Sequence, residues 1–239
     1  MHLLRRLFGQ PATDPIHVTD QRILDRYLKK PDFPWLISFP RTGSHWLRMI
    51  MELYFGKPGL RRIFFYPDAN DFTCYHWHDV DLATQDVKSV IYLYRYPVDT
   101  IYSQLRYHKE DVQSAERVRH WSMVYARHLS KWLFDETFTN RKTVVRYEGL
   151  QREPHAEFGK ICTHLDLPFD PGRLDAAMSK VSKSKLKEKT QHDEQIVNLS
   201  NEYANEKETF RGRFGTLILD VMAEENPRVG KLWSDGEAR

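Results

Sequence analysis

The sequence has little cysteine and no long apolar segment. Its two cysteines, Cys74 and Cys162, form no C-x-x-C pair, which argues against a disulfide-stapled scaffold and indicates a reducing compartment. No apolar run approaches the roughly 18 residues of a membrane span. The start of the sequence, MHLLRRLFGQPATDP, lacks the apolar core of a signal peptide. We therefore expect a soluble, cytoplasmic protein without a transmembrane segment.

A strong charge of one sign is also absent. The net charge is +3 over 239 residues, and no stripe of Lys and Arg with interleaved aromatics occurs, so we expect no nucleic-acid partner. We find no internal repeat and no low-complexity block. With 41% hydrophobic and 13% aromatic residues, the chain can bury a sizeable core as one domain. The sequence does not predict an oligomeric state.

The sequence does contain an alternation of short apolar strands and helical segments. The predicted strands are 35–39, 71–79, 89–95 and 142–148. The predicted helices are 19–30, a helix from Leu47 that stops at Gly56, a helix from Pro97, and 116–134, 155–167 and 173–181. This order is typical of a single α/β domain with a central parallel sheet flanked by helices, which binds ligands at the carboxyl ends of its strands.

The domain boundaries follow from composition. We expect an N-terminal extension with a helix over residues 1–33 and the α/β domain over 34–239. Residues 182–209 are rich in Lys, Glu, Asn and Ser with few apolar residues, which predicts a mobile lid or loop. A merely disordered connection is the alternative for that segment.

The segment PRTGSHW, from Pro40 to Trp46, joins the first strand to a helix and is suited to bind an anion. Backbone N–H groups and the positive end of a helix dipole converge in such a turn. Gly43 allows close approach, and the neighbouring Arg, Thr and Ser side chains add donors. The phosphate-loop pattern G-x-x-x-x-G-K-[ST] is absent, so an ordinary strand-to-helix turn remains an alternative.

A second candidate anion site lies in YLYRYPVDTIYSQ. Arg95 stands at the carboxyl end of a predicted strand, and Ser103 stands one helical turn beyond Asp99. An arginine fork beside a hydroxyl donor can bind a phosphate dianion. The alternative is that Arg95 only pairs with Asp99 and that Ser103 is incidental.

These segments together resemble the sulfotransferases that use 3′-phosphoadenosine-5′-phosphosulfate (PAPS). In that family a loop P-[KR]-[ST]-G-[ST]-x-W-L binds the 5′-phosphosulfate, and PRTGSHWL matches it. The family motif R-x-P-x-D, with a serine eight residues after the arginine, is matched by RYPVDTIYS, and FRGRFG is similar to its basic G-x-x-G segment. The similarity covers about Trp35 to Gly215 and implies a P-loop-nucleotide-kinase-like sulfotransferase fold.

The resemblance implies an enzyme that moves a sulfuryl group from PAPS to a hydroxyl or amine and releases adenosine 3′,5′-bisphosphate (PAP). It implies that the following residues hold the donor: Arg41, Thr42, Gly43, Ser44, His45, Trp46, Arg95, Ser103, Tyr147, Ser182, Arg211 and Gly212. In this assignment Trp46 stacks on adenine, Tyr147 approaches the adenine edge, and Ser182 alone matches a second adenine-contacting segment. Arg95, Ser103 and Arg211 bind the 3′-phosphate, with the Gly212 backbone against it.

Sulfuryl transfer needs a cation at the leaving phosphate and a base at the acceptor. Arg41 is the expected cation, although many family members have lysine there. His76 and His78 share one face of a predicted strand, and histidine titrates near neutrality. We expect His78 to be the base and His76 to occupy the place of a family lysine. Two polar strand residues that face solvent are the alternative.

Two other functions use the same residues. Cys74, His76 and His78 on one strand face could bind zinc in a metal-dependent hydrolase, although the following Asp79 and Asp81 lie on the opposite face and no fourth ligand is evident nearby. A non-catalytic nucleotide-binding protein is the other alternative. The sequence leaves the acceptor open among a small molecule, a carbohydrate and a lipid headgroup. Its pocket is expected between segments 56–70 and 182–209, which include several Arg, Phe and Tyr residues.

Overall fold

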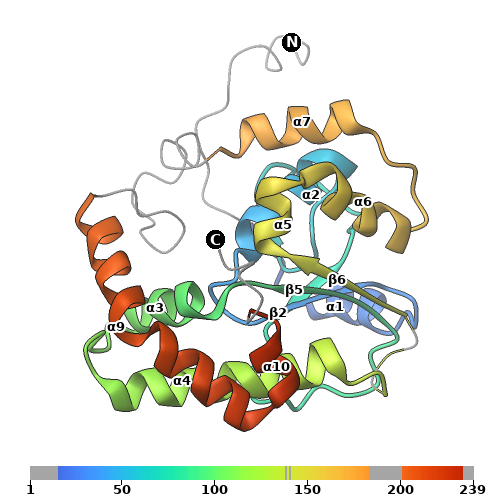
Figure 1. Ribbon diagram of the computed structural model, residues 1–239. Helices are drawn as coiled ribbons and strands as arrows, with labels where there is room; N and C mark the ends of the chain where they lie inside the picture. The colour runs from blue at the N-terminus through green and yellow to red at the C-terminus, as the bar shows by residue number, and fades with distance from the viewer. Residues whose placement is uncertain (1–15, 138, 140, 183–200, 234–239) are drawn as a thin grey trace.

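The computed structural model describes residues 16–137, 139, 141–182 and 201–233 (Figure 1). A four-stranded parallel sheet forms its centre. The strands, in spatial order, are β4 (Tyr75–Trp77), β2 (Trp35–Ser38), β5 (Ser89–Tyr94) and β6 (Arg141–Arg146). Helices cover both faces of this sheet (Figure 1), which confirms the predicted single α/β domain.

Two apolar clusters sandwich the sheet, because successive strand residues point to opposite faces. Leu36 and Ile91 are fully buried on the face covered by α2 (Ser44–Phe55), α5 (Tyr147–Arg152), α6 (Pro154–His164) and α7 (Pro171–Lys180). Ile37 and Tyr92 are fully buried on the other face, against α3 (Pro97–His108), α4 (Ala115–Leu129) and α9 (Asn201–Glu225). The short α10 (Pro227–Lys231) packs on α9. Both faces of the sheet are therefore buried, as expected for parallel strands.

A third apolar cluster lies beside the edge strand β4. It joins α1 (Gln21–Leu28) to the strand through Leu24 and Tyr27, which pack with Phe72 and Tyr75. The two-residue strands β1 (Ile16–His17) and β3 (Arg62–Ile63) pair antiparallel in a small separate sheet. This pairing brings the start of the described chain against the segment that follows α2.

Several predicted boundaries differ from the structure. Helix α2 begins at Ser44, earlier than predicted, and the strand expected over 71–79 has only three residues. The long helix expected over 116–134 ends its α-helical part at Leu129 and continues as a π-helical turn, η2 (Ser130–Phe134). In the part of the chain described here, no helix has the length and apolar character required to cross a bilayer.

The loop predicted over 182–209 is wrong from residue 201 onward, because α9 begins at Asn201. Phe210, Phe214 and Ile218 form a buried helical face against α3 and α4, and this tertiary packing outweighs the polar composition of the first turns. Residues 183–200 lie outside the described residues.

The carboxyl ends of the four parallel strands meet at one edge of the sheet. β2 ends at Ser38 before the turn 39–43, β4 ends before His78, β5 ends before Arg95, and β6 ends before Tyr147. The two predicted anion-binding motifs and the predicted histidine base are thus brought together by sheet topology, although they are far apart in the sequence.

Candidate active site

The turn between β2 and α2 has the tight backbone that its sequence predicts. Arg41 and Gly43 both adopt left-handed conformations, with φ of 69° and 94°. The Thr42 hydroxyl donates to the carbonyl of Phe39 at 2.7 Å and closes the turn. Because Gly43 is the N-cap of α2 and has no side chain that could cap the helix, the first N–H groups of α2 are available to an anion.

Glycine is required at position 43 for a second reason. A Cβ atom there would lie 2.4 Å from the ring of Tyr147, which is far inside van der Waals contact. Tyr147 also packs edge-on against Trp46, with ring centroids 5.5 Å apart. The two aromatic residues expected at the adenine are therefore in contact with each other at the N-terminal end of α2.

Arg41 links the two predicted anion sites. Its Nε–H donates to the Ser103 hydroxyl on α3 at 3.0 Å, and its guanidinium lies over the ring of Tyr107, 5.2 Å from the centroid. Arg95 donates through Nη1 to the carbonyl of Arg41 at 3.2 Å, and its guanidinium lies 4.4 Å from the ring centroid of Tyr147. The loop after β2 and the loop after β5 thus form one continuous site.

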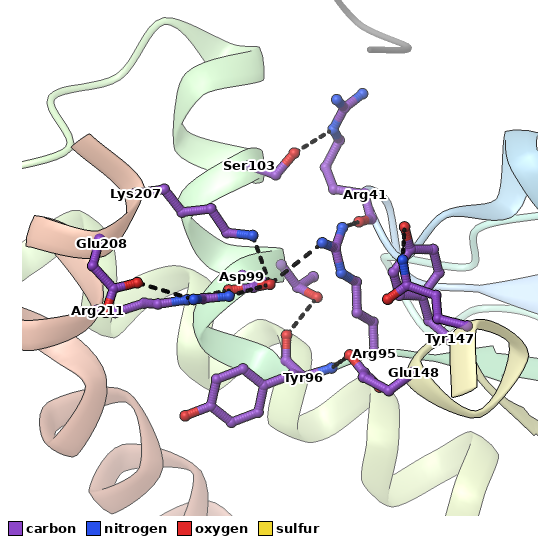
Figure 2. Close-up of polar contacts among 12 residues, drawn as sticks. Arg41, Arg95, Tyr96, Asp99, Ser103, Tyr147, Glu148, Lys207, Glu208 and Arg211 are labelled. Carbon is purple, nitrogen blue, oxygen red and sulfur yellow. Dashed lines mark hydrogen bonds and ion pairs between the residues drawn. The ribbon is translucent and has the colours of Figure 1, made fainter. Parts of the chain in front are cut away.

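The second site is a cluster of three cations around one carboxylate, Asp99 (Figure 2). Lys207 Nζ and Arg211 Nη2 donate to Asp99 Oδ2 at 2.7 and 2.9 Å, and Arg211 Nε donates to Oδ1 at 2.8 Å. Arg95 Nη2 is 3.4 Å from Oδ2. The Arg95–Asp99 pair that the sequence left as an alternative is therefore present, and α9 adds two further cations to it.

The cluster around Asp99 carries excess positive charge. Burial alone would raise the pKa of Asp99, but Arg95, Lys207 and Arg211 outweigh burial and hold that pKa below its usual value. Asp99 is thus ionised at neutral pH and neutralises only one of the three cations. Glu208, which also contacts Arg211, is 74% exposed and is screened by water. The remaining charge matches that of a phosphate monoester, roughly −1.5 to −2 near neutral pH.

Lys207 is a member of the cluster around Asp99 that the sequence analysis missed. It lies four residues before Arg211, and this spacing places both side chains on one face of a helix. The spacing could have been noticed only if α9 had been predicted to begin before residue 207.

His78 has one ring nitrogen engaged and the other available. Its Nδ1 lies 2.7 Å from the carbonyl oxygen of Ser38 and 3.4 Å from the Ser38 hydroxyl. A carbonyl oxygen only accepts, so Nδ1 carries the proton and Nε2 has the lone pair. Among the described residues, no group hydrogen-bonds to Nε2. Burial, and then Arg48 and Arg41, lower the pKa of His78, against the opposing effect of the Ser38 carbonyl.

His76 has both ring nitrogens engaged. Arg48, which can only donate, has Nη1 3.4 Å from His76 Nδ1, so Nδ1 is the acceptor. His76 Nε2 then carries the proton and donates to the Ser38 hydroxyl oxygen at 3.1 Å. Burial and the adjacent Arg48 place the pKa of His76 well below its usual value. The two histidine rings are in edge contact, with centroids 4.6 Å apart, and only His78 has a nitrogen that can accept a proton from a ligand.

His45, on the first turn of α2, is also neutral. Burial, followed by Arg62, Arg48 and Arg41, lowers its pKa to about 2. Its Nε2 accepts from Arg62 Nη1 at 2.5 Å. Arg62 is followed by a segment whose backbone is held by Glu52 of α2, which accepts from the N–H groups of residues 64, 65 and 66 at 2.6 to 3.1 Å. This buried carboxylate fixes the 64–66 segment, part of the expected acceptor wall, on α2.

One of the expected donor contacts, the Gly212 backbone, does not have the expected geometry. Gly212 lies inside α9, where its N–H belongs to the helical hydrogen-bond ladder, and an added Cβ would meet nothing within 4 Å. The Gly212 backbone is therefore not positioned as a phosphate donor, contrary to what the resemblance implied. Ser182 follows α7 and is half-buried, while residue 183, beyond it, lies outside the described residues.

The geometry disfavours the zinc site considered for Cys74, His76 and His78. Within the described ranges, no group of three or more His, Cys, Asp and Glu residues is arranged to hold a metal ion. Cys74 is buried in the apolar cluster around α2, and His76 faces the guanidinium of Arg48. A cation at hydrogen-bonding distance from a would-be ligand opposes metal binding by charge repulsion.

Comparisons with known proteins connect this geometry to one family. A model of the sulfotransferase family matches residues 88–171, a range that includes Arg95, Asp99, Ser103 and Tyr147. The structure of mouse sulfotransferase SULT7A1 complexed with PAP is similar over 90% of this chain and 92% of that one, with a TM-score of 0.56 and 14% identity. Retinol dehydratase in complex with androsterone and inactive cofactor PAP is similar over 92% and 86%, with a TM-score of 0.52 and 10% identity. No curated protein matches the sequence.

These findings show the fold and a family pattern in part of the chain. The chain has the sulfotransferase fold, and residues 88–171 carry the sequence pattern of the sulfotransferase family. The resemblance found in the sequence motifs is thus confirmed. The family match supports an enzyme.

Proposed function

We propose that this protein transfers a sulfuryl group from PAPS to a hydroxyl or amine of an acceptor. The observation that carries the proposal is the joining of two anion sites of different character. One is the helix N-terminus after β2, and the other is the cation cluster around Asp99, with Arg41 and Arg95 connecting them. A nucleotide with phosphoryl groups at both its 5′ and 3′ ends fits such a pair. The PAP named for the two structural neighbours is a nucleotide of this kind.

In this proposal the residues divide between the two ends of the donor. Thr42, Ser44 and His45 lie at the turn and the first turn of α2, where N–H groups and side chains can bind the 5′ end. Arg95, Ser103, Lys207 and Arg211 bind the 3′-phosphate. The half-buried Trp46 stacks on the adenine, and Tyr147, whose ring contacts Trp46 and carries the Arg95 guanidinium, approaches the adenine edge. Lys207 is added to the residues expected from the sequence, and the Gly212 backbone is removed.

The reaction requires a residue that accepts one proton and a cation that neutralises one developing negative charge. The acceptor oxygen or nitrogen attacks the sulfur in line, the bond from sulfur to the 5′-phosphate oxygen breaks, and PAP leaves. His78 Nε2 accepts the proton of the acceptor, because Nδ1 already donates to the Ser38 carbonyl. Arg41 neutralises the charge that develops on the leaving phosphate, and the N–H groups at the start of α2 assist it.

The direct test has two parts. Isothermal titration calorimetry should show that the wild-type protein binds PAP more tightly than adenosine 5′-phosphate, because only PAP engages the cluster around Asp99. Incubation with radiolabelled PAPS and a panel of phenols, amines, sugars and lipid headgroups should give a labelled product with one of these classes. Equal affinity for the two nucleotides would contradict the donor assignment. Preference for PAP without transfer to any class would favour the non-catalytic alternative.

We also predict an acid limb in the pH profile that lies below pH 6.5. A base must be neutral to act, and burial with Arg48 and Arg41 lowers the pKa of His78 from its ordinary value near 6.5. His45 and His76, which also face His78, remain neutral in this range. The ratio kcat/KM for PAPS reports the free enzyme, so it should stay level at pH 6.5 and fall only through the lowered pKa.

The profile of kcat supplies the control for this prediction. Bound PAPS brings negative charge near His78, which opposes the effect of the arginines and raises the pKa, so the limb in kcat should lie at higher pH than the limb in kcat/KM. The His78→Ala variant should lack the limb in its residual activity. A limb in kcat/KM above pH 6.5 would be inconsistent with a buried base beside two arginines.

A further inference from the structure

The residue after His78 has an unusual backbone that other side chains hold in place. Asp79 has a φ of 46°, in the left-handed region that few residues other than glycine adopt. Its Oδ1 accepts from the backbone N–H of Thr84 at 2.8 Å. Its Oδ2 accepts from Lys131 Nζ and from Trp132 Nε1, both at 2.9 Å. The carboxylate is therefore fully engaged, and its side chain is 0% exposed.

The two side-chain donors come from the π-helical turn η2. This turn is closed by the N–H of Asp135, which donates to the carbonyl of Ser130 at 3.2 Å. Lys131 Nζ also donates to the carbonyls of Leu82 and Thr84 at 2.7 and 2.6 Å. One ammonium group thus binds the beginning and the end of the turn 79–84. Single π-helical turns inside α-helices are frequent at functional sites.

A second contact fixes the backbone of His78 itself. His128 of α4 donates from Nε2 to the carbonyl of His78 at 2.7 Å, and the Tyr92 hydroxyl on β5 donates to His128 Nδ1 at 2.9 Å. Burial lowers the pKa of His128 to about 3, so the ring stays neutral and keeps this one tautomer at neutral pH. A donor from α4, which is itself oriented by Tyr92 of β5, therefore holds the carbonyl of His78, and donors from η2 hold the side chain of Asp79 that follows it.

We propose that Asp79, Lys131, Trp132 and His128 are positioning residues that fix the orientation of His78 Nε2 toward the acceptor. This inference rests on the proposed role of His78 as the base. A buried ion pair such as Lys131–Asp79 is by itself weak evidence for stability, because desolvation offsets much of its attraction. What this ion pair determines, together with the left-handed backbone of Asp79, is the position at which the chain turns directly after His78. Misplacement of a catalytic group by about 1 Å can cost 10²-fold in rate.

The test removes the Lys131–Asp79 ion pair without leaving a buried charge unpaired. In the double variant Asp79→Gly/Lys131→Met both partners are gone, and glycine adopts the left-handed conformation without strain. The turn is then free to move, and His78 becomes more exposed to water. We expect kcat to fall by roughly 10²-fold, while the affinity for PAP, measured by calorimetry, stays within a factor of about two. The pKa of His78, followed by NMR titration of its ring, should rise toward the ordinary value near 6.5 because the burial of the ring decreases. It should stay below that value, since Arg41, Arg48, His45 and His76 remain.

Two comparisons separate positioning from a merely structural role. In the His78→Ala background the double change should reduce the remaining activity by much less than 10²-fold, because there is no longer a base to misplace. Ile161→Val in α6, a buried position in the other apolar cluster, should lower the Tm without changing the pKa of His78. If the double variant does not fold, Tyr92→Phe removes only the hydroxyl that orients His128 and should shift both readouts in the same direction by a smaller amount.

The outcomes are distinct. An unchanged pKa of His78 with unchanged turnover overturns the inference, and so does a loss of turnover that is equally large in the His78→Ala background. If His78→Ala is as active as wild type, the proposed base is wrong. The NMR titration then decides by itself whether Asp79 and Lys131 control the environment of His78.

Discussion

Replacing His78 by alanine is expected to lower turnover by roughly 10²–10⁴-fold, the usual contribution of a positioned proton acceptor, and to leave the affinity for PAP almost unchanged. The reason is the tautomer: Nδ1 donates to the Ser38 carbonyl at 2.7 Å, which leaves Nε2 as the basic atom. The cations at the 5′ and 3′ ends are contributed by other residues. Steady-state kinetics with PAPS and the best acceptor of the screen, together with calorimetry on PAP, measure the two effects separately.

His76→Ala is the matched comparison, because His76 is adjacent in the same network but has both ring nitrogens engaged by Arg48 and Ser38. We expect a smaller loss of turnover from it, with the acid limb of the pH profile retained. The opposite ranking of the two variants would make His76 the base. Full activity in both would exclude both histidines. Asp79 would not be the next candidate, since its carboxylate is buried and bound by Lys131, Trp132 and Thr84, and Asp81 would take its place.

Much of the fold could be predicted from local sequence patterns. The apolar runs predicted as strands at 35–39 and 89–95 form β2 and β5, each one residue shorter than predicted, and Gly56 ends α2 in the left-handed conformation that its position indicated. The order of strands and helices implied a parallel sheet, and a parallel sheet implies that strand ends carry the site. For this reason the turn at 40–46 and Arg95 could be assigned to one crevice before any contact was known.

The remainder depended on contacts between distant segments. Lys207 joins the cluster around Asp99 only because α9 packs on α3 and α4 across roughly a hundred residues of sequence. Composition indicated a loop there, since the fully buried apolar residues of α9 begin only at Phe210 and the half-buried Tyr203 is the one aromatic residue before it that packs on the cluster. The tautomers of His76 and His78 could likewise not be predicted from the sequence, because they are set by Arg48 and Ser38 on neighbouring elements. Residue types identified which groups could act, and packing decided which atoms are available.

The second large effect concerns the 3′-phosphate. We expect Arg95→Ala and Lys207→Met each to weaken PAP binding by roughly 10- to 10²-fold, since a hydrogen bond to a charged group contributes about 1.5–3 kcal/mol and 1.4 kcal/mol is a factor of ten. Affinity for adenosine 5′-phosphate, which has no 3′-phosphate, should change little in the Lys207 variant. It should fall somewhat in the Arg95 variant, because Arg95 also supports the Arg41 carbonyl and the Tyr147 ring. Calorimetric titration of each variant with both nucleotides gives the four affinities needed.

Arg213→Met provides the matched control, because it removes a cation from the same helix that contacts Gln113 and not Asp99. It should leave both affinities near wild type, apart from a small long-range effect that disappears as salt is added. If Lys207→Met and Arg213→Met weaken PAP equally, the cluster acts only as a diffuse positive field. If Lys207→Met weakens both nucleotides equally, α9 supports the whole pocket and not the 3′-phosphate. A selective loss for PAP in the Lys207 variant alone requires a direct contact, because charge is removed from one helix in both variants and only the position of that charge differs.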